Sequence, residues 1–272
     1  MNQGKRLRGF VTMDGGLTAW GLHVGSDTDR VSPRGVDAPV LANPMQENGP
    51  YLSASALKGK LRHWGEYLYA SQWDTARGAY LNKDVQRADE RVFFRHECPD
   101  EVKAASCLVC GIFGAAASGD QATHYPRRLT FRHLMPEKDG VTTEVKAENA
   151  IVSRMAPEAN PRRIERLPLK TGFRFQAVYT IGADETPQVL SDRLCFLLAC
   201  MRILEDDYVG GNGSRGYGKV AFGPLQIRLF NPVPVSAEAL KNPCVLKDLQ
   251  AFLRGDEGRK VLEEAFFQEG KS

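Results

Sequence analysis

The fold can be worked out from one glycine-rich stretch, Val209-Gly210-Gly211-Asn212-Gly213-Ser214-Arg215-Gly216-Tyr217-Gly218-Lys219-Val220. Five of the nine residues from 210 to 218 are glycine, so the backbone can adopt positive φ angles and approach a ligand closely. Exposed amides in such a loop form an anion-binding concavity, and Arg215 and Lys219 add positive charge. The stretch therefore predicts a phosphate-binding loop, with a merely flexible connection as the alternative.

The flanks of this loop exclude two common nucleotide-binding loops. A helix-like apolar run over residues 190–204 precedes the glycines, and a strand-like run over residues 219–229 follows them. A dinucleotide-binding loop needs the opposite order, strand and then helix, although the spacing Gly211-x-Gly213-x-x-Gly216 matches its glycine pattern. No Gly-Lys-Ser/Thr sequence ends the loop, which excludes a Walker-type phosphate loop.

Outward from the loop, apolar periodicity predicts an α+β fold. Strands are expected at residues 6–13 and 18–24 around an Asp14-Gly15-Gly16 turn, and at 127–134, 173–181 and 219–229. A first helix is expected after Ser53 or Ser55, either of which can cap it, and it carries one apolar stripe of Leu57, Leu61, Trp64 and Leu68. A second helix is expected at 187–205. Without its insertions this order is β-α-β-β-α-β, the ferredoxin-like layout that the common RNA-recognition (RRM) domain also uses.

Composition places the chain among ordinary globular proteins. It has 272 residues, 42% of them hydrophobic and 25% charged, with a net charge of +3. No apolar run of about 18 residues is present and the N-terminal residues are polar, so we expect no membrane span, no signal peptide and a cytoplasmic location. Thiols stay reduced there, so the six cysteines are expected to be metal ligands or core residues, with Cys195 and Cys200 in the core.

Local clusters of positive charge supply candidate polyanion contacts. Lys58 and Arg62 lie four residues apart on one helix face, close to a helix N-terminus that itself favours phosphate. The alternative for this pair is an ordinary solvated face. Between residues 127 and 174 basic residues outnumber acidic ones in loop-like sequence, where cations are free to meet phosphates; they include Arg127, Arg128, Arg163 and Arg166.

Four residues have the spacing of a zinc site. His96-x-Cys98 is followed by Cys107-x-x-Cys110, and three thiolates with one imidazole can complete a tetrahedral shell. Four protein ligands leave no open position, so the predicted Zn²⁺ is structural. His124 stays open as an alternative to the less standard His-x-Cys half. A redox role is disfavoured because no βαβ pattern surrounds the Cys-x-x-Cys motif.

Several motifs, in family order, resemble the RAMP (Cas7-type) proteins of CRISPR systems, most closely the backbone subunits of type III effector complexes. The resemblance covers about residues 6–230. Its motifs are Gly21-Leu-His23-Val-Gly25, Gly35-Val-Asp37-Ala-Pro39-Val40, Ser55-Ala-Leu-Lys58-Gly-Lys-Leu-Arg62, Cys107-Leu-Val-Cys110-Gly-Ile-Phe-Gly114, Ala147-Glu-Asn-Ala-Ile151, Arg163-Ile-Glu-Arg166 and Gly213-Ser-Arg215-Gly-Tyr-Gly-Lys219-Val.

The resemblance implies a subunit that stacks with further copies of itself, other Cas7-type subunits and other type III CRISPR subunits. Together they would hold a guide RNA (crRNA) and its target RNA, with no membrane partner. Residues 1–232 would form the RNA-binding domain, with a zinc-binding insertion at about 71–114 and a thumb-like hairpin at about 140–170. Residues 233–272 would form a helical C-terminal extension, predicted from two amphipathic pieces near 246–253 and 259–267.

The resemblance also assigns roles to single residues. Asp37 matches the family's aspartate that cuts target RNA, with a divalent cation such as Mg²⁺. His23, Lys58, Arg62, Ser214 and Arg215 match positions near the guide or the cut site. With the basic and loop residues above, the predicted RNA-binding set is His23, Ser55, Lys58, Arg62, Arg127, Arg128, Arg163, Arg166, Gly213, Ser214, Arg215 and Lys219.

Two other functions stay open. Asp37 could only cap a turn, as loop aspartates commonly do, which would leave a purely structural RNA-binding subunit. A Cas6-type enzyme that processes guide RNA shares the fold and would use His23, but the zinc motif and the long excursion at 144–168 disfavour it. The sequence also departs from the family at Ser53-Ala54-Ser55-Ala56, where Pro-Gly-Ser-Ser is usual, and it is longer at 71–106 and after 232.

Overall fold

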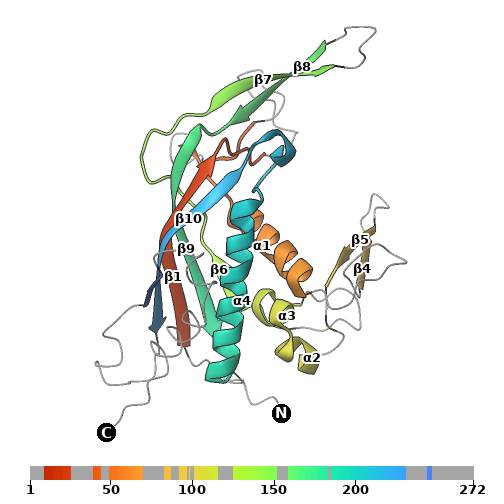
Figure 1. Cartoon of the computed structure of the whole chain (residues 1–272), viewed down its shortest axis with the longest axis vertical. Helices are drawn as coiled ribbons and strands as arrows, with labels where there is room; N and C mark the ends of the chain where they lie inside the picture. Colours follow the sequence, from red (N-terminus) through yellow and green to blue (C-terminus); the bar gives the residue numbers. More distant parts are fainter. Residues whose placement is uncertain are drawn as a thin grey trace.

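The computed structural model describes residues 9–25, 39–43, 49–69, 83–86, 92–96, 98, 101–115, 125–151, 159–182, 185–230 and 244–246. Over these ranges the chain forms one antiparallel sheet, two long helices against it, and smaller excursions from its edges (Figure 1). The observed class is α+β, as the sequence predicts. Within the described residues no helix is long and apolar enough to cross a membrane.

The central sheet has five strands in the order β11-β10-β1-β9-β6, and every neighbouring pair is antiparallel. Its strands are β1 (Gly9–Trp20), β6 (Leu129–Phe131), β9 (Leu169–Ile181), β10 (Lys219–Phe230) and β11 (Cys244–Leu246). The strands predicted at 173–181 and 219–229 are confirmed. The one predicted at 127–134 is shorter, and its end is held by an isolated bridge between Leu134 and Leu52.

Two helices, α1 (Ala54–Tyr69) and α4 (Pro187–Asp206), lie on the same face of this sheet (Figure 1). Both begin at hydroxyl caps: Ser53 Oγ accepts from the Ala56 amide at 3.2 Å, and Thr186 Oγ1 accepts from the Val189 amide at 3.3 Å. Both helices are therefore confirmed close to their predicted bounds.

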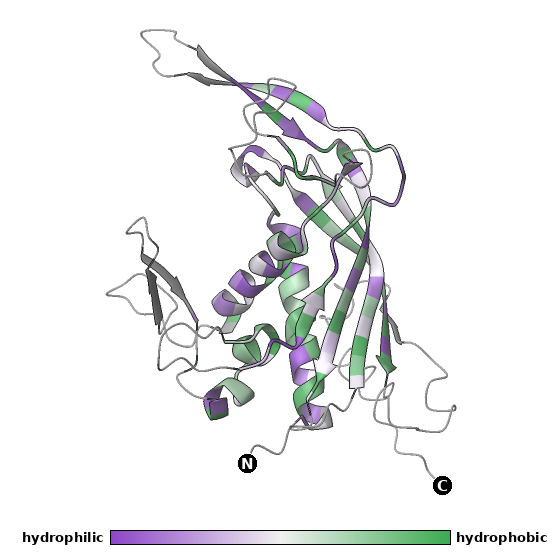
Figure 2. Cartoon of the chain, turned by 180° about the vertical axis from the view of Figure 1, so that it is seen from behind, coloured by the Kyte–Doolittle hydropathy of each residue, from purple (hydrophilic) through white to green (hydrophobic). Residues whose placement is uncertain are grey.

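Alternation of buried and exposed residues along β1 and β9 builds the core beneath these helices. Figure 2 shows the same alternation as hydrophobic and hydrophilic bands along the strands. Leu57 and Leu61 of α1 are fully buried, whereas Leu68 at the end of the predicted stripe is exposed. Cys200 is a core residue as predicted, and the partly buried Cys195 packs against the core.

The prediction of two strands around an Asp14-Gly15-Gly16 turn is wrong, because β1 is one continuous strand. Its register with β10 shifts between Gly15 and Leu17, so the glycines mark an irregularity within the strand. A Cβ on Gly15 would lie 2.6 Å from the Pro224 carbonyl oxygen. Glycine is needed here because two strands approach each other closely. Glycine in a strand pattern can therefore indicate such a close approach as well as a turn.

The excursions from the sheet carry regular structure of their own. In the segment where the resemblance implies a thumb-like hairpin, β7 (Glu144–Ile151) and β8 (Ala159–Arg166) form an antiparallel pair that projects from one end of the sheet (Figure 1). The insertion expected at about 71–114 contains β4 (Lys83–Gln86), β5 (Val92–Arg95), α2 (Glu101–Ser106) and α3 (Leu108–Phe113), which were not predicted. Two short strands, β2 (Ala42–Asn43) and β3 (Gly49–Pro50), precede α1.

The predicted C-terminal extension contributes a strand. β11 (Cys244–Leu246) pairs with β10 and extends the central sheet at that edge. The amphipathic segments predicted near 246–253 and 259–267 otherwise lie outside the described residues.

Candidate nucleic-acid interface and metal centre

The glycine loop is folded tightly against the end of β1. Its centre is a 3-10 turn, η1 (Gly213–Arg215), between Asn212 and Gly216, which both have left-handed backbone angles. A Cβ on Gly210 would lie 2.1 Å from the His23 carbonyl oxygen, and one on Gly218 would lie 2.0 Å from that of Val209. The loop therefore needs glycine for its own packing, whether or not a ligand approaches it.

Four of the loop's amides bond to protein carbonyls. The Gly211 amide donates to His23 at 2.8 Å, and the Gly218 amide donates to Trp20 at 3.0 Å. The amides of Arg215 and Gly216 close the turn on Asn212 and Gly213. The expectation that the loop's amides face a ligand is wrong for these four. The positive charge of the loop is carried by Arg215 and Lys219, both exposed.

Arg215 connects the glycine loop to the β7–β8 hairpin. Its Nη1 donates to Glu148 Oε2 at 2.8 Å, and the Tyr217 hydroxyl donates to Glu148 Oε1 at 2.7 Å. The Lys146 ammonium and the Arg166 guanidinium each lie 5.0 Å from the Tyr217 ring centroid. The Tyr217 hydrogen bond, assisted by Lys146 and Arg215, lowers the pKa of Glu148. Glu148 is thus a carboxylate held charged at the base of the hairpin.

His23 belongs to the same junction. The residue follows β1, is buried, and places Nδ1 2.7 Å from the carbonyl oxygen of Glu165 in β8. The Glu165 carboxylate accepts from the Val40 amide at 2.9 Å and from the Thr143 hydroxyl. The structure therefore brings together His23, the glycine loop, the hairpin and Val40.

Lys58 lies in a second group of cations, on the face of α1 turned toward β6. Its ammonium donates to the Leu129 carbonyl at 3.2 Å. Burial, followed by the nearby positive charges of Arg127 and Arg62, lowers the pKa of Lys58 to about 8. Arg127, which the sequence placed in a different basic cluster, therefore lies near the predicted pair of Lys58 and Arg62, and the three positive charges repel one another.

The same helix reaches the glycine loop through a different residue, Lys60. Its ammonium lies 2.8 Å from Asp207 Oδ2 and 3.8 Å from the centroid of the Tyr208 ring, just before the loop. Because residues two apart on a helix point to nearly opposite sides, Lys58 faces away from this contact. The structure thus gives two cationic groups, one at each side of α1.

The remaining predicted residues divide by burial. Arg128 is 5% exposed and donates to the Tyr125 hydroxyl at 3.0 Å, so we leave it out of the RNA-contacting set. Arg166 pairs with Glu144 at 2.6 Å. Ser55, Arg127, Arg163 and Ser214 are exposed. Asp37 and His124 lie outside the described residues.

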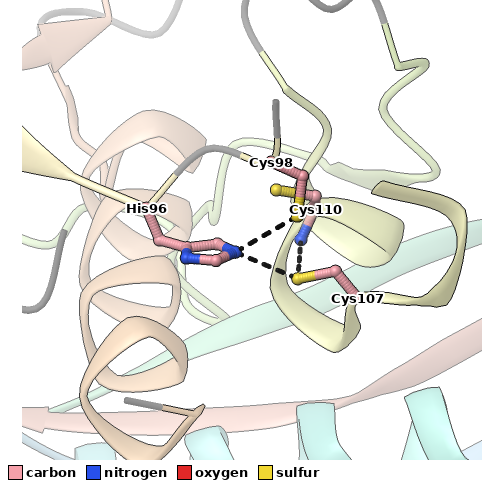
Figure 3. A group of neighbouring side chains, drawn as sticks. All are labelled: His96, Cys98, Cys107 and Cys110. Carbon is pink, nitrogen blue, oxygen red and sulfur yellow. Dashed lines mark hydrogen bonds between the residues drawn. The ribbon is translucent and has the colours of Figure 1, made fainter. Parts of the chain in front are cut away.

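The His/Cys motif forms one compact cluster that could hold a metal ion such as zinc (Figure 3). His96 follows β5, Cys98 comes two residues later, and Cys107 and Cys110 belong to the start of α3. The four ligand atoms lie within 4.8 Å of one another, with His96 Nε2 3.1 Å from Cys107 Sγ and 3.5 Å from Cys98 Sγ. The structure thus brings together the four residues of the predicted set, whereas the alternative ligand His124 lies outside the described residues.

The chemistry of this cluster fits zinc. A tetrahedral zinc ion with ligands at about 2.0–2.3 Å requires ligand atoms about 3.3–3.8 Å apart. His96 Nε2 lies 3.1 Å from Cys107 Sγ and 3.5 Å from Cys98 Sγ, close to that range. The Cys110 thiol hydrogen bond lowers the pKa of Cys107 to about 4, with further help from His96. The same shared proton raises the pKa of Cys110. One thiolate is thus favoured before any metal binds, and a cation would complete the deprotonation.

Four residues at or beside the junction were not found as site residues from the sequence: Glu148, Glu165, Tyr217 and Lys60. Tyr217 stands inside the glycine stretch and Glu165 inside the Arg163–Arg166 motif, but neither has a pattern that distinguishes a junction residue from a surface one. Their partners are 69 and 125 residues away in the chain. Only the folded chain shows those contacts.

Comparison with known proteins gives a consistent family. Residues 21–221 match the model of the RAMP superfamily. The chain is 32% identical over 214 residues to the CRISPR system Cms endoribonuclease Csm3 of Streptococcus thermophilus, covering 76% of this chain and 83% of that protein. It is 29% identical over 233 residues to the protein of the same name from Methanothermobacter thermautotrophicus, covering 78% and 82%.

A solved structure has the same fold. The crystal structure of a Csm3-Csm4 subcomplex in the type III-A CRISPR-Cas interference complex matches with a TM-score of 0.52 at 21% identity, covering 95% of this chain and 97% of that one. The family match spans most of the chain, and the matched residues include the glycine loop, His23 and α1. The chain therefore belongs to the RAMP superfamily and is a Csm3-like member of it.

Proposed function

We propose that this protein is a guide-RNA-binding backbone subunit of a type III CRISPR effector complex that cleaves bound target RNA with Asp37. The observation that carries the proposal is the junction at one end of the sheet. There the Gly211 amide bonds to His23, His23 bonds to Glu165 of the hairpin, and Arg215 bonds to Glu148. Exposed cations of the loop and hairpin surround this junction and suit a ribose-phosphate strand.

The proposed core is ferredoxin-like. The strand order β10-β1-β9-β6 and the chain order β1, α1, β6, β9, α4, β10 support this assignment. In this scheme the β7–β8 hairpin is the thumb that disturbs the guide–target duplex, and the insertion with the His/Cys cluster is a zinc-binding module. Recognition would be mainly of the RNA backbone, since the loop and α1 offer cations rather than base-reading groups.

The proposed partners are crRNA, target RNA, further copies of this chain or other Cas7-type subunits, and other type III subunits. The names of the relatives support an endoribonuclease, and the similar fold in a Csm3-Csm4 subcomplex supports assembly with such subunits. Structural Zn²⁺ is proposed at His96, Cys98, Cys107 and Cys110. A second divalent cation, proposed as Mg²⁺, would help to neutralise charge during cleavage.

The proposed chemistry needs little from the protein beyond alignment and proton transfer. The 2′-OH of a nucleotide splayed by the thumb can attack the adjacent 3′-phosphate if the two are held in line. A 2′,3′-cyclic phosphate forms, the bond from phosphorus to the 5′-oxygen of the next nucleotide breaks, and that oxygen takes up a proton from water. The Asp37 carboxylate would take the 2′-OH proton as a general base. Cations of the loop would balance charge on the phosphate. A slow cut at regular intervals along the bound target is the expected outcome.

Substitution of Asp37 tests this function. In the assembled complex, Asp37→Ala should lower the rate of target cleavage by about a hundredfold or more, because a general base is worth about that much. Guide and target affinity should stay the same. The measurement is single-turnover cleavage of labelled target, with electrophoretic binding assays in parallel.

Asp139→Ala, an exposed turn aspartate, is the matched control and should cleave normally. If Asp37→Ala cleaves target at the wild-type rate, the alternative function, a purely structural RNA-binding subunit, is favoured. Processing of precursor guide RNA by the free chain, dependent on His23, would favour the Cas6-type alternative instead.

A further inference from the structure

We propose that Arg62 is a positioning residue that couples the metal centre to the cationic face of α1, so that metal loss weakens RNA binding. The proposal rests on the proposed zinc and RNA sites. It changes the role of Arg62 from a phosphate contact, as the sequence suggested, to a bridge inside the protein. Its basis is a set of contacts between Arg62 and the backbone around the ligands.

Every nitrogen of the Arg62 guanidinium is engaged by the protein. Nη2 donates to the carbonyl of His96, itself a predicted ligand, at 2.9 Å. Nη1 donates to the carbonyl of Gly114 at 2.9 Å, and Nε donates to Glu66 Oε1 at 2.8 Å. The side chains of Arg62 and Glu66 are 19% and 12% exposed, so the three bonds lie mostly out of solvent.

These contacts reach both ends of the ligand set. His96 is the first ligand in the chain, and Gly114 ends α3, whose first turn carries Cys110. The Gly114 amide donates to the Cys110 carbonyl at 2.9 Å, so Gly114 is attached directly to the last ligand. The rigid, planar guanidinium of Arg62 therefore holds the segment of His96 and the segment of Gly114 together, as convergence of the four ligands requires.

The coupling extends from Arg62 to the other cations. Lys58 lies one turn earlier on the same face of α1. Arg127 packs on Gly114, where an added Cβ would lie 2.6 Å from Arg127 Cγ. A shift of α3 after metal loss would displace Gly114 and with it both Arg62 and Arg127. The spacing of the phosphate-binding cations thus depends on a metal that touches none of them.

The first test measures zinc release from the full-length chain. Elemental analysis should find one zinc ion per chain. With a chromophoric chelator in excess, Arg62→Ala and Arg62→Lys should release zinc about tenfold faster than wild type, because an ammonium cannot bond both carbonyls as the fork does. Lys60→Ala is the matched control: it removes an ion pair from the same helix, to Asp207, and should release zinc at the wild-type rate.

The second test joins the metal to RNA binding. Removing zinc should weaken guide-RNA affinity of the wild-type chain severalfold. The same treatment should change Arg62→Ala much less, because its bridge is already lost. Circular dichroism of each variant before and after stripping identifies any that unfold, and Arg62→Lys then replaces Arg62→Ala.

Each contrary result has a distinct meaning. Equal zinc release from wild type and both Arg62 variants would overturn the coupling and leave the RNA-binding function intact. Equal loss of RNA affinity on stripping in wild type and variant would overturn it as well. If the wild-type chain contains no zinc, both the coupling and the metal centre are rejected. If zinc stabilises the chain but the chain does not bind RNA, the proposed function is rejected, and with it the link from the metal to RNA binding.

Discussion

At the scale of single residues, burial and neighbouring charge change what a side chain can do. Lys58 and Arg215 were both expected to meet phosphate, yet their surroundings differ. Arg215 is exposed and paired with Glu148, whereas Lys58 is partly buried beside two other cations. A guanidinium keeps its charge at any ordinary pH, but the lowered pKa of the ammonium makes its charge depend on pH.

RNA binding should therefore depend on pH through Lys58. A bound phosphate favours the ammonium form, so the pKa of Lys58 is higher in the complex than in the free chain. Below about pH 8 the free residue is already charged, and affinity should be flat. Above it, a proton must be taken up on binding, so affinity should fall by up to about tenfold per pH unit.

The measurement is the dissociation constant of guide RNA across this range at constant ionic strength. Lys58→Arg should bind with a flat profile, because an arginine stays protonated throughout. An identical slope in wild type and Lys58→Arg would place the titrating group elsewhere.

At the scale of elements, the hairpin and the glycine loop are held together by a few side chains. β7 and β8 pair with each other rather than with the central sheet, so their attachment depends on contacts at the hairpin base. Glu148 on β7 supplies one of these by accepting from both Arg215 and Tyr217. The angle of the proposed thumb is thus set partly by one carboxylate.

A double-mutant cycle on Glu148 and Arg215 should detect this contact. With Glu148→Gln and Arg215→Gln, alone and combined, the coupling free energy should be about 0.5 kcal/mol, because Arg215 is more than half exposed and solvent screens the pair. Chemical denaturation of the full chain gives the four stabilities.

The sign of the pH dependence gives a second check. Because the pKa of Glu148 is lowered in the folded chain, its contribution is present above its ordinary pKa and should disappear as the pH falls through the folded value. Glu144 pairs with Arg166 inside the hairpin, so a Glu144→Gln control should show no coupling to Arg215.

At the scale of the whole molecule, one buried polar network joins the sheet, α4 and the insertion that carries the His/Cys cluster. Arg193 of α4 is 2% exposed and bonds to Glu185, to the Tyr179 hydroxyl of β9 at 3.2 Å, and to the carbonyl of Ala105 at the end of α2. Glu185 also lies 3.5 Å from the buried Arg128. A single carboxylate thus faces two buried guanidinium groups.

Loss of that carboxylate should destabilise the whole chain. Glu185→Gln removes a negative charge that pairs with both Arg193 and Arg128 in a buried site, which should lower the free energy of unfolding by about 3 kcal/mol or more. Denaturant titration followed by circular dichroism measures the change. Asp206→Asn, which removes the exposed ion pair with Arg202, should cost well under about 1 kcal/mol. Similar losses for both variants would mean that the network contributes little.

The separation in sequence between interacting residues explains which features of this protein could be predicted. The helices, the strands at 173–181 and 219–229, and the His/Cys cluster depend on periodicity and short spacing, which are visible in the sequence. The continuous β1 was missed because the glycines at 15 and 16 signal a turn as well as a bulge, and only contact with Pro224 distinguishes the two. The regular structure inside 71–111 was missed because polar sequence hides short elements.

The sequence by itself determined the order of the two long helices and of the strands at 173–181 and 219–229, the family, and the four residues that could hold a metal ion, because these depend on local pattern and on motif order. Only the tertiary structure decided which cations stand together, which of the loop's amides are engaged, and that Arg62 bonds to the backbone of the metal site. Those outcomes depend on contacts between segments tens of residues apart in the chain. Hydrogen bonds between such segments produce no periodic pattern in the amino-acid sequence.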